Sequence, residues 1–220
     1  MTDDRKEAAA SGECAISGVP GTGAEIKLAF LDPADSKTGA LRPTGNVVDM
    51  LDGIEASCTD TANPCIFIGA ADLGVTGTEL PDEISNNIPL LRRLEDSRRF
   101  GARSMKLCKE IQHAPRAVSK IARVSKAAKH RVLSGEVDIV ARVMSDGQPH
   151  RSIPLTAASC TGVAAPLKGS VEEALLAPKR VEDGVLTRQL GVRVELVKLV
   201  RTRTKRATYA QPPCSAQRDH

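Results

Sequence analysis

Residues 156–165 read TAASCTGVAA, an uninterrupted run of small residues that is followed at once by Pro166. Alanine favours a helix and proline ends one, so the run predicts a helix whose small side chains let its neighbours approach closely. The unpaired N–H groups at the start of such a helix favour anions. We therefore expect the amides of Thr156, Ala157 and Ala158 to contribute to a carboxylate site.

The stretches on either side of this helix alternate between strand and helix patterns. Ala24–Phe30 has the period-two alternation of a half-buried strand, whereas Cys65–Ile68 is a short apolar run typical of a strand buried on both faces. Val137–Met144 fits either a helix or a strand. The remaining predicted strands are Val47–Leu51, Lys120–Val124 and Val192–Val200.

One long helix is expected over residues 87–112, with Asn87 as its N-terminal cap. Glu95 and Arg99 are four residues apart and would form an ion pair on its surface. A second, short helix is expected over residues 170–176. Strands and helices interleave irregularly, which favours an α+β fold over a doubly wound α/β sheet.

The composition argues against several classes of partner. The 220 residues carry a net charge of +4 and include one Tyr, three Phe and no Trp, so few rings are present on which nucleobases could stack. The basic stretch Lys179–Arg206 fits either a nucleic-acid contact or a strand with a solvated charged face, and its alternation with apolar residues favours the strand. We expect no nucleic-acid partner. No apolar run of membrane-spanning length and no signal-like start is found, so we expect no membrane partner and a cytoplasmic protein.

The six cysteines do not predict a metal site. No two of them are separated by two residues, so the spacing of a zinc ribbon is missing, and neither an HExxH nor a phosphate-loop motif occurs. We expect reduced thiols, no metal and no cofactor. Cys160, inside the predicted small-residue helix, fits a buried inert thiol, although a place near a helix start also allows a reactive one.

Polar residues outside this helix offer further groups for binding a carboxylate. Thr44-Gly45-Asn46 combines backbone amides with a hydroxyl and a side-chain amide. Asn63 is held in an extended conformation by the proline that follows it. His150 lies in a polar turn, with Ser145 close by in the sequence. On its own, His150 fits a surface or structural histidine as well as a binding residue.

In their order along the chain, these motifs resemble the second domain of the PrpF family. That family comprises 2-methylaconitate cis–trans isomerase and relatives such as methylitaconate isomerase and oxalomesaconate tautomerase. The similarity runs from about Ile16 to Arg206. The segments that carry it are Gly18–Ala24, Lys37–Gly39, Pro43–Asn46, Ala62–Pro64, Leu90–Glu95, Lys120–Ala122, Asp138–Ser145, His150, Thr156–Ala165 and Arg201-Thr202.

The resemblance implies one diaminopimelate-epimerase-like domain of the α+β class. Such a domain is a mixed, mostly antiparallel sheet curled around a central helix, here at about 156–165, with the long helix at 87–112 on its surface. The implied domain covers residues 16–208, after a flexible N-terminus at 1–15 and before a disordered tail at 209–220. In this family the active site lies between two such domains.

The resemblance also implies a chemistry: cofactor-free proton transfer beside carboxylates, which moves or rotates a carbon–carbon double bond. Asn63-Pro64 looks like the Asn-Pro pair that contacts substrate in this fold. The expected ligand is a small unsaturated di- or tricarboxylate, similar to methylaconitate or aconitate. The expected substrate-binding residues are Thr44, Gly45, Asn46, Asn63, Ser145, His150, Thr156, Ala157 and Ala158.

This sequence departs from the family pattern at three places. Family members are about twice as long and carry their catalytic lysine and cysteine in an N-terminal domain without a counterpart here, so no catalytic residue is assigned and Cys160 does not take that role. Lys179–Gly184 lacks the family's Gly-His-Pro-Ser-Gly-like loop, and Ser145-Asp146-Gly147 replaces its Ser-Met-Gly.

We therefore expect half of an isomerase, inactive alone, whose missing groups a separate N-terminal domain or a homodimer would supply. The alternative is a non-catalytic binding or dimerisation module that retains only the fold.

Overall fold

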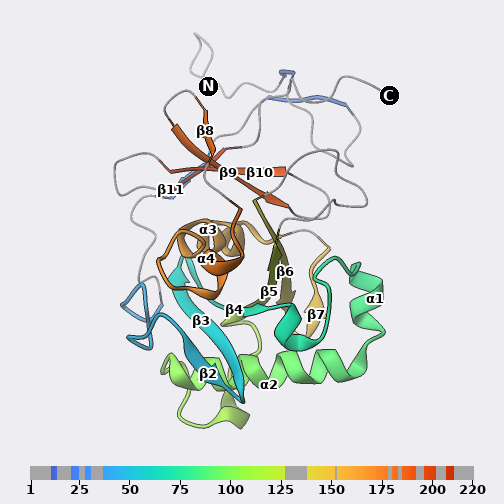
Figure 1. Cartoon of the computed structure of the whole chain (residues 1–220), viewed down its shortest axis with the longest axis vertical. Helices are drawn as coiled ribbons and strands as arrows, with labels where there is room; N and C mark the ends of the chain where they lie inside the picture. Colours follow the sequence, from blue (N-terminus) through green and yellow to red (C-terminus); the bar gives the residue numbers. More distant parts are fainter. Residues whose placement is uncertain are drawn as a thin grey trace.

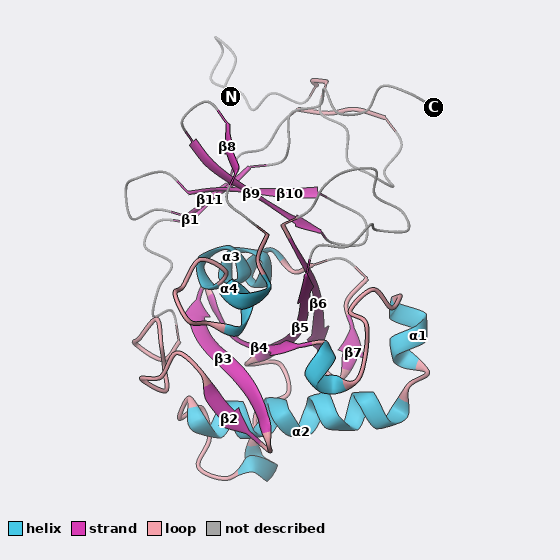
Figure 2. Ribbon diagram, viewed as in Figure 1, coloured by secondary structure: helices cyan, strands magenta, loops and turns pink. Residues whose placement is uncertain are grey.

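The computed structural model describes residues 11–13, 21–24, 28–30, 37–126, 138–151, 153–177, 180–182, 185–191, 196–201 and 207–210. Figures 1 and 2 show their arrangement. The strands are β1 (Leu28–Phe30), β2 (Asp49–Leu51), β3 (Ile54–Thr61), β4 (Asn63–Gly69), β5 (Lys120–Lys126), β6 (Ile139–Ser145), β7 (Gln148–Pro149), β8 (Arg180–Glu182), β9 (Val185–Gly191), β10 (Leu196–Arg201) and β11 (Ala207–Ala210). The helices are α1 (Pro81–Ser85), α2 (Ile88–Ser104), α3 (Leu155–Ala164) and α4 (Val171–Leu175), with short 3-10 turns η1 (Ala71–Leu73) and η2 (Ile111–His113).

These strands form one mixed sheet. Their order is β1-β11-β10-β9-β6-β5-β4-β3-β2, with β7 beside β6 and β8 beside β9. Two pairs are parallel, β4 with β5 and β6 with β9, and the other described pairs are antiparallel. The expected mixed, mostly antiparallel sheet of an α+β domain is confirmed.

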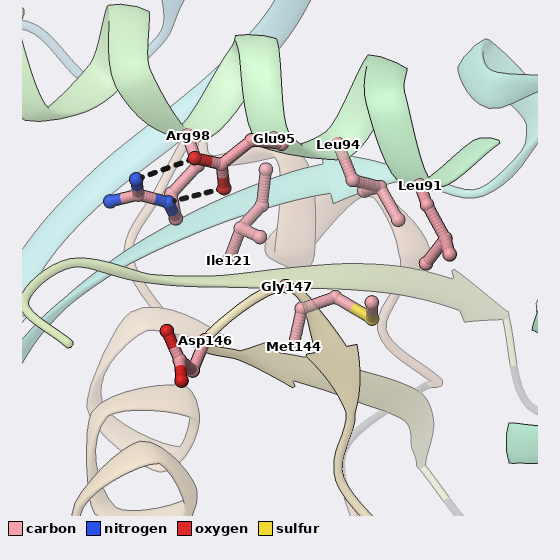
Figure 3. A pocket seen from close by; sticks show the side chains of 8 residues that line it. All are labelled: Leu91, Leu94, Glu95, Arg98, Ile121, Met144, Asp146 and Gly147. Atoms are coloured by element: carbon pink, nitrogen blue, oxygen red, sulfur yellow. Dashed lines mark hydrogen bonds and ion pairs between the residues drawn. The ribbon is translucent and has the colours of Figure 1, made fainter. Parts of the chain in front are cut away.

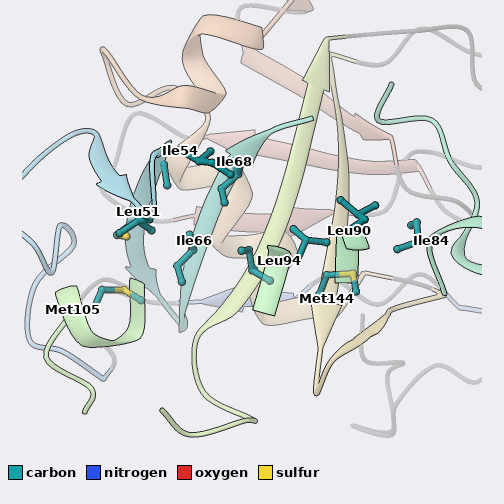
Figure 4. Packing of buried hydrophobic residues seen from close by; sticks show 12 residues of the cluster. Leu51, Ile54, Ile66, Ile68, Ile84, Leu90, Leu94, Met105 and Met144 are labelled. Carbon is teal, nitrogen blue, oxygen red and sulfur yellow. The ribbon is translucent and has the colours of Figure 1, made fainter. Parts of the chain in front are cut away.

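Strand β4 lies in the middle of the core, because both of its faces are covered. Cys65 and Phe67 belong to an apolar cluster with α3, whereas Ile66 and Ile68 belong to a second cluster with α2 (Figure 4). The two sets alternate because successive side chains of a strand point to opposite faces. The prediction that residues 65–68 form a strand buried on both faces is confirmed.

Helix α3 is enclosed by the sheet. It contacts β3 and β4 on one side and β9, β10 and β11 on the other (Figure 1). Ala158, Cys160 and Ala164 have no exposed surface at all, so the sheet closes directly onto the helix. The prediction of a helix at 156–165 is confirmed to within one residue at each end, and so is its central position.

Helix α2 covers the opposite face of the sheet (Figure 2). It begins as predicted, since the side-chain oxygen of Asn87 accepts a backbone N–H of the first turn at 3.1 Å. The predicted end near Gln112 is wrong. Lys106 takes a φ of 60° and the N–H of Leu107 donates back to the carbonyl of Ala102 at 2.9 Å, which closes the helix in a Schellman-type motif.

Two strand pairs turn at an Asp-Gly dipeptide. Asp52-Gly53 joins β2 to β3, and Asp146-Gly147 joins β6 to β7. Their φ angles are 50°, 76°, 53° and 78° in that order, as the two central residues of a type I′ turn require. The second turn follows β6, so the segment 137–144, which fitted either a helix or a strand, forms a strand over Ile139–Ser145.

The other predicted elements are found with shifted bounds. Lys120–Val124 lies within β5, and α4 lies within the helix predicted at 170–176, with the Ser170 side chain accepting the N–H of Glu173 at 3.0 Å. The strand predicted at 47–51 is β2, and 24–30 is described as strand over β1.

The C-terminal predictions are wrong in one respect. Residues 196–200 of the strand predicted at 192–200 lie in β10, and 192–195 lie outside the described residues; β11 follows β10 and pairs with β1. Tyr209 and Ala210, which were expected to lie in a disordered tail, are therefore part of the sheet. Gly18–Pro20, and the residues 178–179 and 183–184 around the altered loop, lie outside the described residues.

A buried ion pair fixes the loop before α1. Arg123 of β5 is 0% exposed and donates from a guanidinium nitrogen to Glu79 Oε2 at 2.6 Å. Partial burial acts to raise the pKa of Glu79, but hydrogen bonds from the hydroxyl and N–H of Thr76 and from its own backbone N–H, together with the charge of Arg123, outweigh it and lower the pKa to about 2. The pair holds the loop against the sheet because separating it would leave a buried charge without a partner.

Gly101 allows α2 to approach β4 closely. A Cβ placed on Gly101 would lie 2.4 Å from Cδ1 and 2.8 Å from Cγ1 of Ile66, which is itself fully buried. We expect Gly101→Ala to lower the free energy of unfolding by about 1–3 kcal/mol, although alanine favours a helix by about 1 kcal/mol over glycine. Urea denaturation measures the change, with Ser104→Ala at the exposed helix end as the control. An unchanged or higher midpoint for Gly101→Ala would contradict the close approach.

The carboxyl group of Glu172, in α4, is fully buried. Neither of its oxygens has a hydrogen-bond partner among the described residues. The nearby hydroxyls of Ser57 and Ser170 donate instead to the backbone carbonyls of Val47 and Ala164. Burial raises the pKa of Glu172 to about 8, so the group is protonated in the folded protein at neutral pH.

Glu172 makes stability depend on pH. Its pKa is raised in the folded state, so the unfolded chain ionises first, and stability is full at low pH and is lost as the pH rises toward 8. We expect the free energy of unfolding to fall by about 3–5 kcal/mol between pH 4.5 and pH 8 from this group. Glu172→Gln should remove most of that slope in urea denaturation, whereas Glu173→Gln, an exposed neighbour, should keep it. Equal slopes for the two variants would rule out the buried acid as the cause.

Candidate functional site

Polar side chains cross one end of the sheet, on the face that α3 covers. The register places Cys65 of β4 beside Lys120 of β5, and Ile121 beside Met144 of β6, so that Lys120 and Ser145 are neighbours. Because side chains alternate between the two faces, Lys120 and Ser145 share the face of Cys65, which packs against α3.

Asn63 and His150 extend this group on its two sides. Asn63 precedes Cys65 by two residues on β4 and therefore points to the same face. The N–H of His150 donates to the carbonyl of Val143 at 2.9 Å, and the register of β6 with β7 places the two residues opposite each other. Asn63, Lys120, Ser145 and His150 thus come from neighbouring strands or their ends, and we call them the polar row.

Lys120 and His150 give the polar row its electrostatic character. The Lys120 ammonium donates a hydrogen bond to the hydroxyl oxygen of Ser145. Partial burial and, to a smaller extent, the charge of Lys120 lower the pKa of His150 below its usual 6.5. The imidazole is therefore neutral at pH 7, with one nitrogen donating and the other accepting.

Helix α3 starts next to this face, five residues after His150. Its cap, Pro154, provides no side-chain hydrogen bond, and the first intrahelical bond runs from the N–H of Ala158 to the carbonyl of Pro154 at 2.9 Å. The N–H groups of Thr156 and Ala157 therefore have no partner within the helix. Ala157 and Ala158 pack in the same apolar cluster as Cys65, which brings the first turn of α3 against the polar-row face.

Two polar groups at the β3–β4 turn lie at the edge of this region. The side-chain nitrogen of Asn63 reaches only the carbonyl of Pro64, at 3.5 Å, the limit of a hydrogen bond. The hydroxyl of Thr61 is completely buried and has no hydrogen-bond partner among the described residues. Ala62 between them takes a φ of 60°, which makes the turn tight.

Thr44, Gly45 and Asn46 form a turn before β2 that is held by Asp49. The Thr44 hydroxyl and the Asn46 amide donate to the two carboxylate oxygens of Asp49, at 2.7 and 2.8 Å, and Gly45 has the φ of 83° that the turn requires. Among the described residues, the hydrogen bonds of these side chains stay within the turn and do not reach the polar row. Binding of a ligand by residues 44–46 stays a prediction, and their donors already serve the loop beside β2.

Cys160 has the properties of the inert thiol. It is fully buried, and its sulfur donates to the carbonyl of Thr59 at 3.4 Å. Burial is the main cause that raises its pKa well above 9, and contact with Cys65 adds to the effect. A thiol without thiolate character is a poor nucleophile, so the alternative of a reactive cysteine is not supported.

Lys120 is the residue of this region that the sequence did not single out. Its alternation with Ala122 and Val124 predicts that the three share one face of a strand, but not which face meets α3. That choice depends on the register of β5 with β4 and β6, in which Lys120 lies opposite Cys65, 55 positions earlier, and Ser145, 25 positions later.

A small recess lies on the other face of the sheet, under α2 (Figure 3). Glu95 accepts hydrogen bonds there from Arg98, at 2.8 Å, and from Arg99 on the helix surface, also at 2.8 Å, which confirms the predicted 95–99 pair. These ion pairs lower the pKa of Glu95. The recess is separated from the polar row by the sheet itself. It is lined by Leu91, Leu94, Glu95, Arg98, Ile121, Met144, Asp146 and Gly147.

The described residues contain no group of three His, Cys, Asp or Glu side chains arranged to hold a metal ion. Within the same residues, no helix has both the length and the apolar character that a membrane span needs. The polar row and the start of α3 contain several hydrogen-bond donors and one ammonium group, that of Lys120. Such a set binds the oxygens of an anion.

Comparison with known proteins agrees with this architecture. The crystal structure of a methylitaconate-delta-isomerase matches with a TM-score of 0.81 and 33% sequence identity, covering 96% of this chain and 59% of that chain. The 3-methylitaconate isomerase of Eubacterium barkeri is 39% identical over 195 residues, or 81% of this chain and 51% of the relative. The 2-methyl-aconitate isomerase of Cupriavidus necator is 34% identical over 177 residues, or 73% of this chain and 45% of the relative.

The chain thus spans about half the length of the curated relatives it matches. The model of the family described as PrpF protein matches residues 5–189, which is most of the sequence. The fold expected from the resemblance, a curled sheet around a central helix, is the fold observed here and shared with the methylitaconate isomerase structure. The chain belongs to the PrpF family.

Proposed function

We propose that this chain is the carboxylate-binding half of a PrpF-family isomerase that acts on small unsaturated di- or tricarboxylates. The polar row and the first turn of α3 form the binding surface, with Asn63, Ser145, His150 and the amides of Thr156 and Ala157 as hydrogen-bond donors, whereas the N–H of Ala158 already donates to the carbonyl of Pro154. The observation that carries the proposal is that α3, whose Thr156 and Ala157 N–H groups have no partner within the helix, packs on the sheet face that carries the polar row, in a chain of this family.

The names of the relatives support this class of substrate. 3-Methylitaconate, 2-methyl-aconitate and oxalomesaconate, named for relatives of this chain, are all unsaturated and carry two or more carboxylates. Helix N–H groups and side-chain donors satisfy carboxylate oxygens with charge-assisted hydrogen bonds. The same donors stabilise the negative charge that develops when a proton leaves the carbon next to a carboxylate.

Proton transfer needs a titratable group within hydrogen-bond reach of the substrate carbon. Among the described residues Cys160 is buried and inert, and the family resemblance implies a catalytic lysine and cysteine in the N-terminal domain of the relatives. We infer that the groups that move the proton come from a region corresponding to the other half of the relatives, supplied as a separate domain or by a second chain. The reaction in this proposal needs neither metal nor cofactor, and the protein works in the cytoplasm with reduced thiols.

Carboxylate binding can be measured on the 220-residue chain with citraconate, an unsaturated dicarboxylate, and its dimethyl ester as the uncharged control. At ten times the Kd, bound citraconate should add about 1.4 kcal/mol of stability and raise Tm by about 3–5 °C. Asn63→Ala should weaken binding about tenfold or more, because it removes a donor to a charged acceptor. Asn86→Ala, an exposed amide in the C-terminal cap of α1, is the matched control. A chain that retains the fold without the site would show no shift with either compound.

Isomerisation by the chain is tested separately, by proton NMR in D2O with aconitate or methylaconitate. We expect no turnover by the chain alone, and turnover after addition of the N-terminal half of a relative. Robust turnover by the chain alone would contradict the inference that the proton-transfer groups lie elsewhere.

His150 should titrate below 6.5 in the free chain, with a midpoint that NMR can follow through its ring Cε1 signal. A lowered folded-state pKa means that the unfolded chain takes up a proton first, so His150 adds stability at neutral pH that is lost as the pH falls below 6.5. Bound citraconate should raise the midpoint, because a nearby anion favours the imidazolium. A free-chain midpoint at or above 6.5 would contradict the placement of His150 beside Lys120.

A further inference from the structure

Lys120 has no carboxylate partner in the part of the chain that the structure describes. Ion pairs found there join Asp52, Asp82, Asp146, Glu79 and Glu95 to arginines, and Glu110 to His113. The ammonium of Lys120 instead donates to the neutral hydroxyl of Ser145. The group that holds this half-buried ammonium is thus neutral and not an opposite charge.

The groups around Lys120 are neutral or donate hydrogen bonds. On its own face of the sheet it borders the Cys65 thiol on one side and Ser145 on the other, with His150 close enough for the charge of Lys120 to lower its pKa. Helix α3 packs on the same face of the sheet, and its N-terminal, positive end begins five residues after His150. The field in this region is therefore positive and favours an anion with more than one negative group.

We propose that Lys120 binds a second carboxylate of the substrate and so makes the site specific for dianions, with Ser145 holding the ammonium when no ligand is bound. This inference rests on the proposed function and names the residue that sets its substrate class. The amides of α3 bind one carboxylate, and Lys120 leaves Ser145 to bind the other. A monocarboxylate satisfies the α3 amides but leaves the Lys120 charge without a partner.

The test compares two ligands and three variants of the full chain by isothermal titration calorimetry. Citraconate is the dicarboxylate and crotonate is the monocarboxylate of similar size. Lys120→Met should weaken citraconate binding about ten- to a hundredfold, the cost of one charge-assisted bond, and crotonate binding by less than about threefold. Lys120→Arg should keep most of the preference for citraconate, since it keeps the charge.

Lys126→Met is the matched control. Lys126 lies at the other end of β5, on the same face by strand alternation, and is exposed, so its loss should change neither affinity.

A second readout separates a binding role from a merely structural one: Lys120→Met should raise the NMR midpoint of His150, because it removes the charge that helps to lower the pKa of that imidazole. Lys126→Met should leave the midpoint where it is.

The outcomes are distinct. Loss of the citraconate preference in Lys120→Met, with retention in Lys120→Arg and Lys126→Met, supports the proposal. Citraconate binding by Lys120→Met that equals the unaltered chain overturns the role of Lys120 and leaves the proposed function standing. Absence of citraconate binding by the unaltered chain overturns both. If Lys120→Met does not fold by circular dichroism, Lys120→Gln, which keeps a polar head that can bond Ser145, takes its place with the same expected results.

Discussion

The packing of helix α3 directly onto strands β3 and β4 is the contact on which the rest of the domain depends. The alanines of α3 are almost completely buried. The Cys160 sulfur lies 3.4 Å from the backbone carbonyl oxygen of Thr59. At such a distance no larger side chain fits between helix and sheet without displacing one of them. The small residues therefore allow the sheet to continue around the helix from β3 to β11.

This contact also decides where the chemistry is. Helix α3 is fixed on the face of the sheet that also carries Asn63, Lys120 and Ser145, at the ends of β4, β5 and β6. The other face has a structural role. There Gly101 brings α2 onto Ile66, and Arg123 forms a buried ion pair with Glu79. The sheet thus has a structural face, covered by α2, and a second face, covered by α3, that also carries the polar row.

Local signals explain the elements that the sequence predicted well. The alanine run predicted α3 because helix propensity and the proline after the run act over a few residues. Asn87 predicted the start of α2 because a helix cap is also a local interaction. The end of α2 was missed because Lys106 takes a left-handed φ that its residue type does not favour. The strand β6 was ambiguous on its own and is settled by its partners, β5 and β9.

The sequence by itself determined the family, the α+β class, the central helix and several polar residues that now lie near one another. These properties depend on local propensity and on the order of motifs, both of which can be read from a linear chain. Only the tertiary structure decided that Lys120 belongs with Ser145 and His150, that the donors of Thr44 and Asn46 serve Asp49, and that Glu172 is buried as a neutral acid. Strand register and burial are set by pairing between segments far apart in the chain, and a shift of one residue would turn Lys120 to the other face.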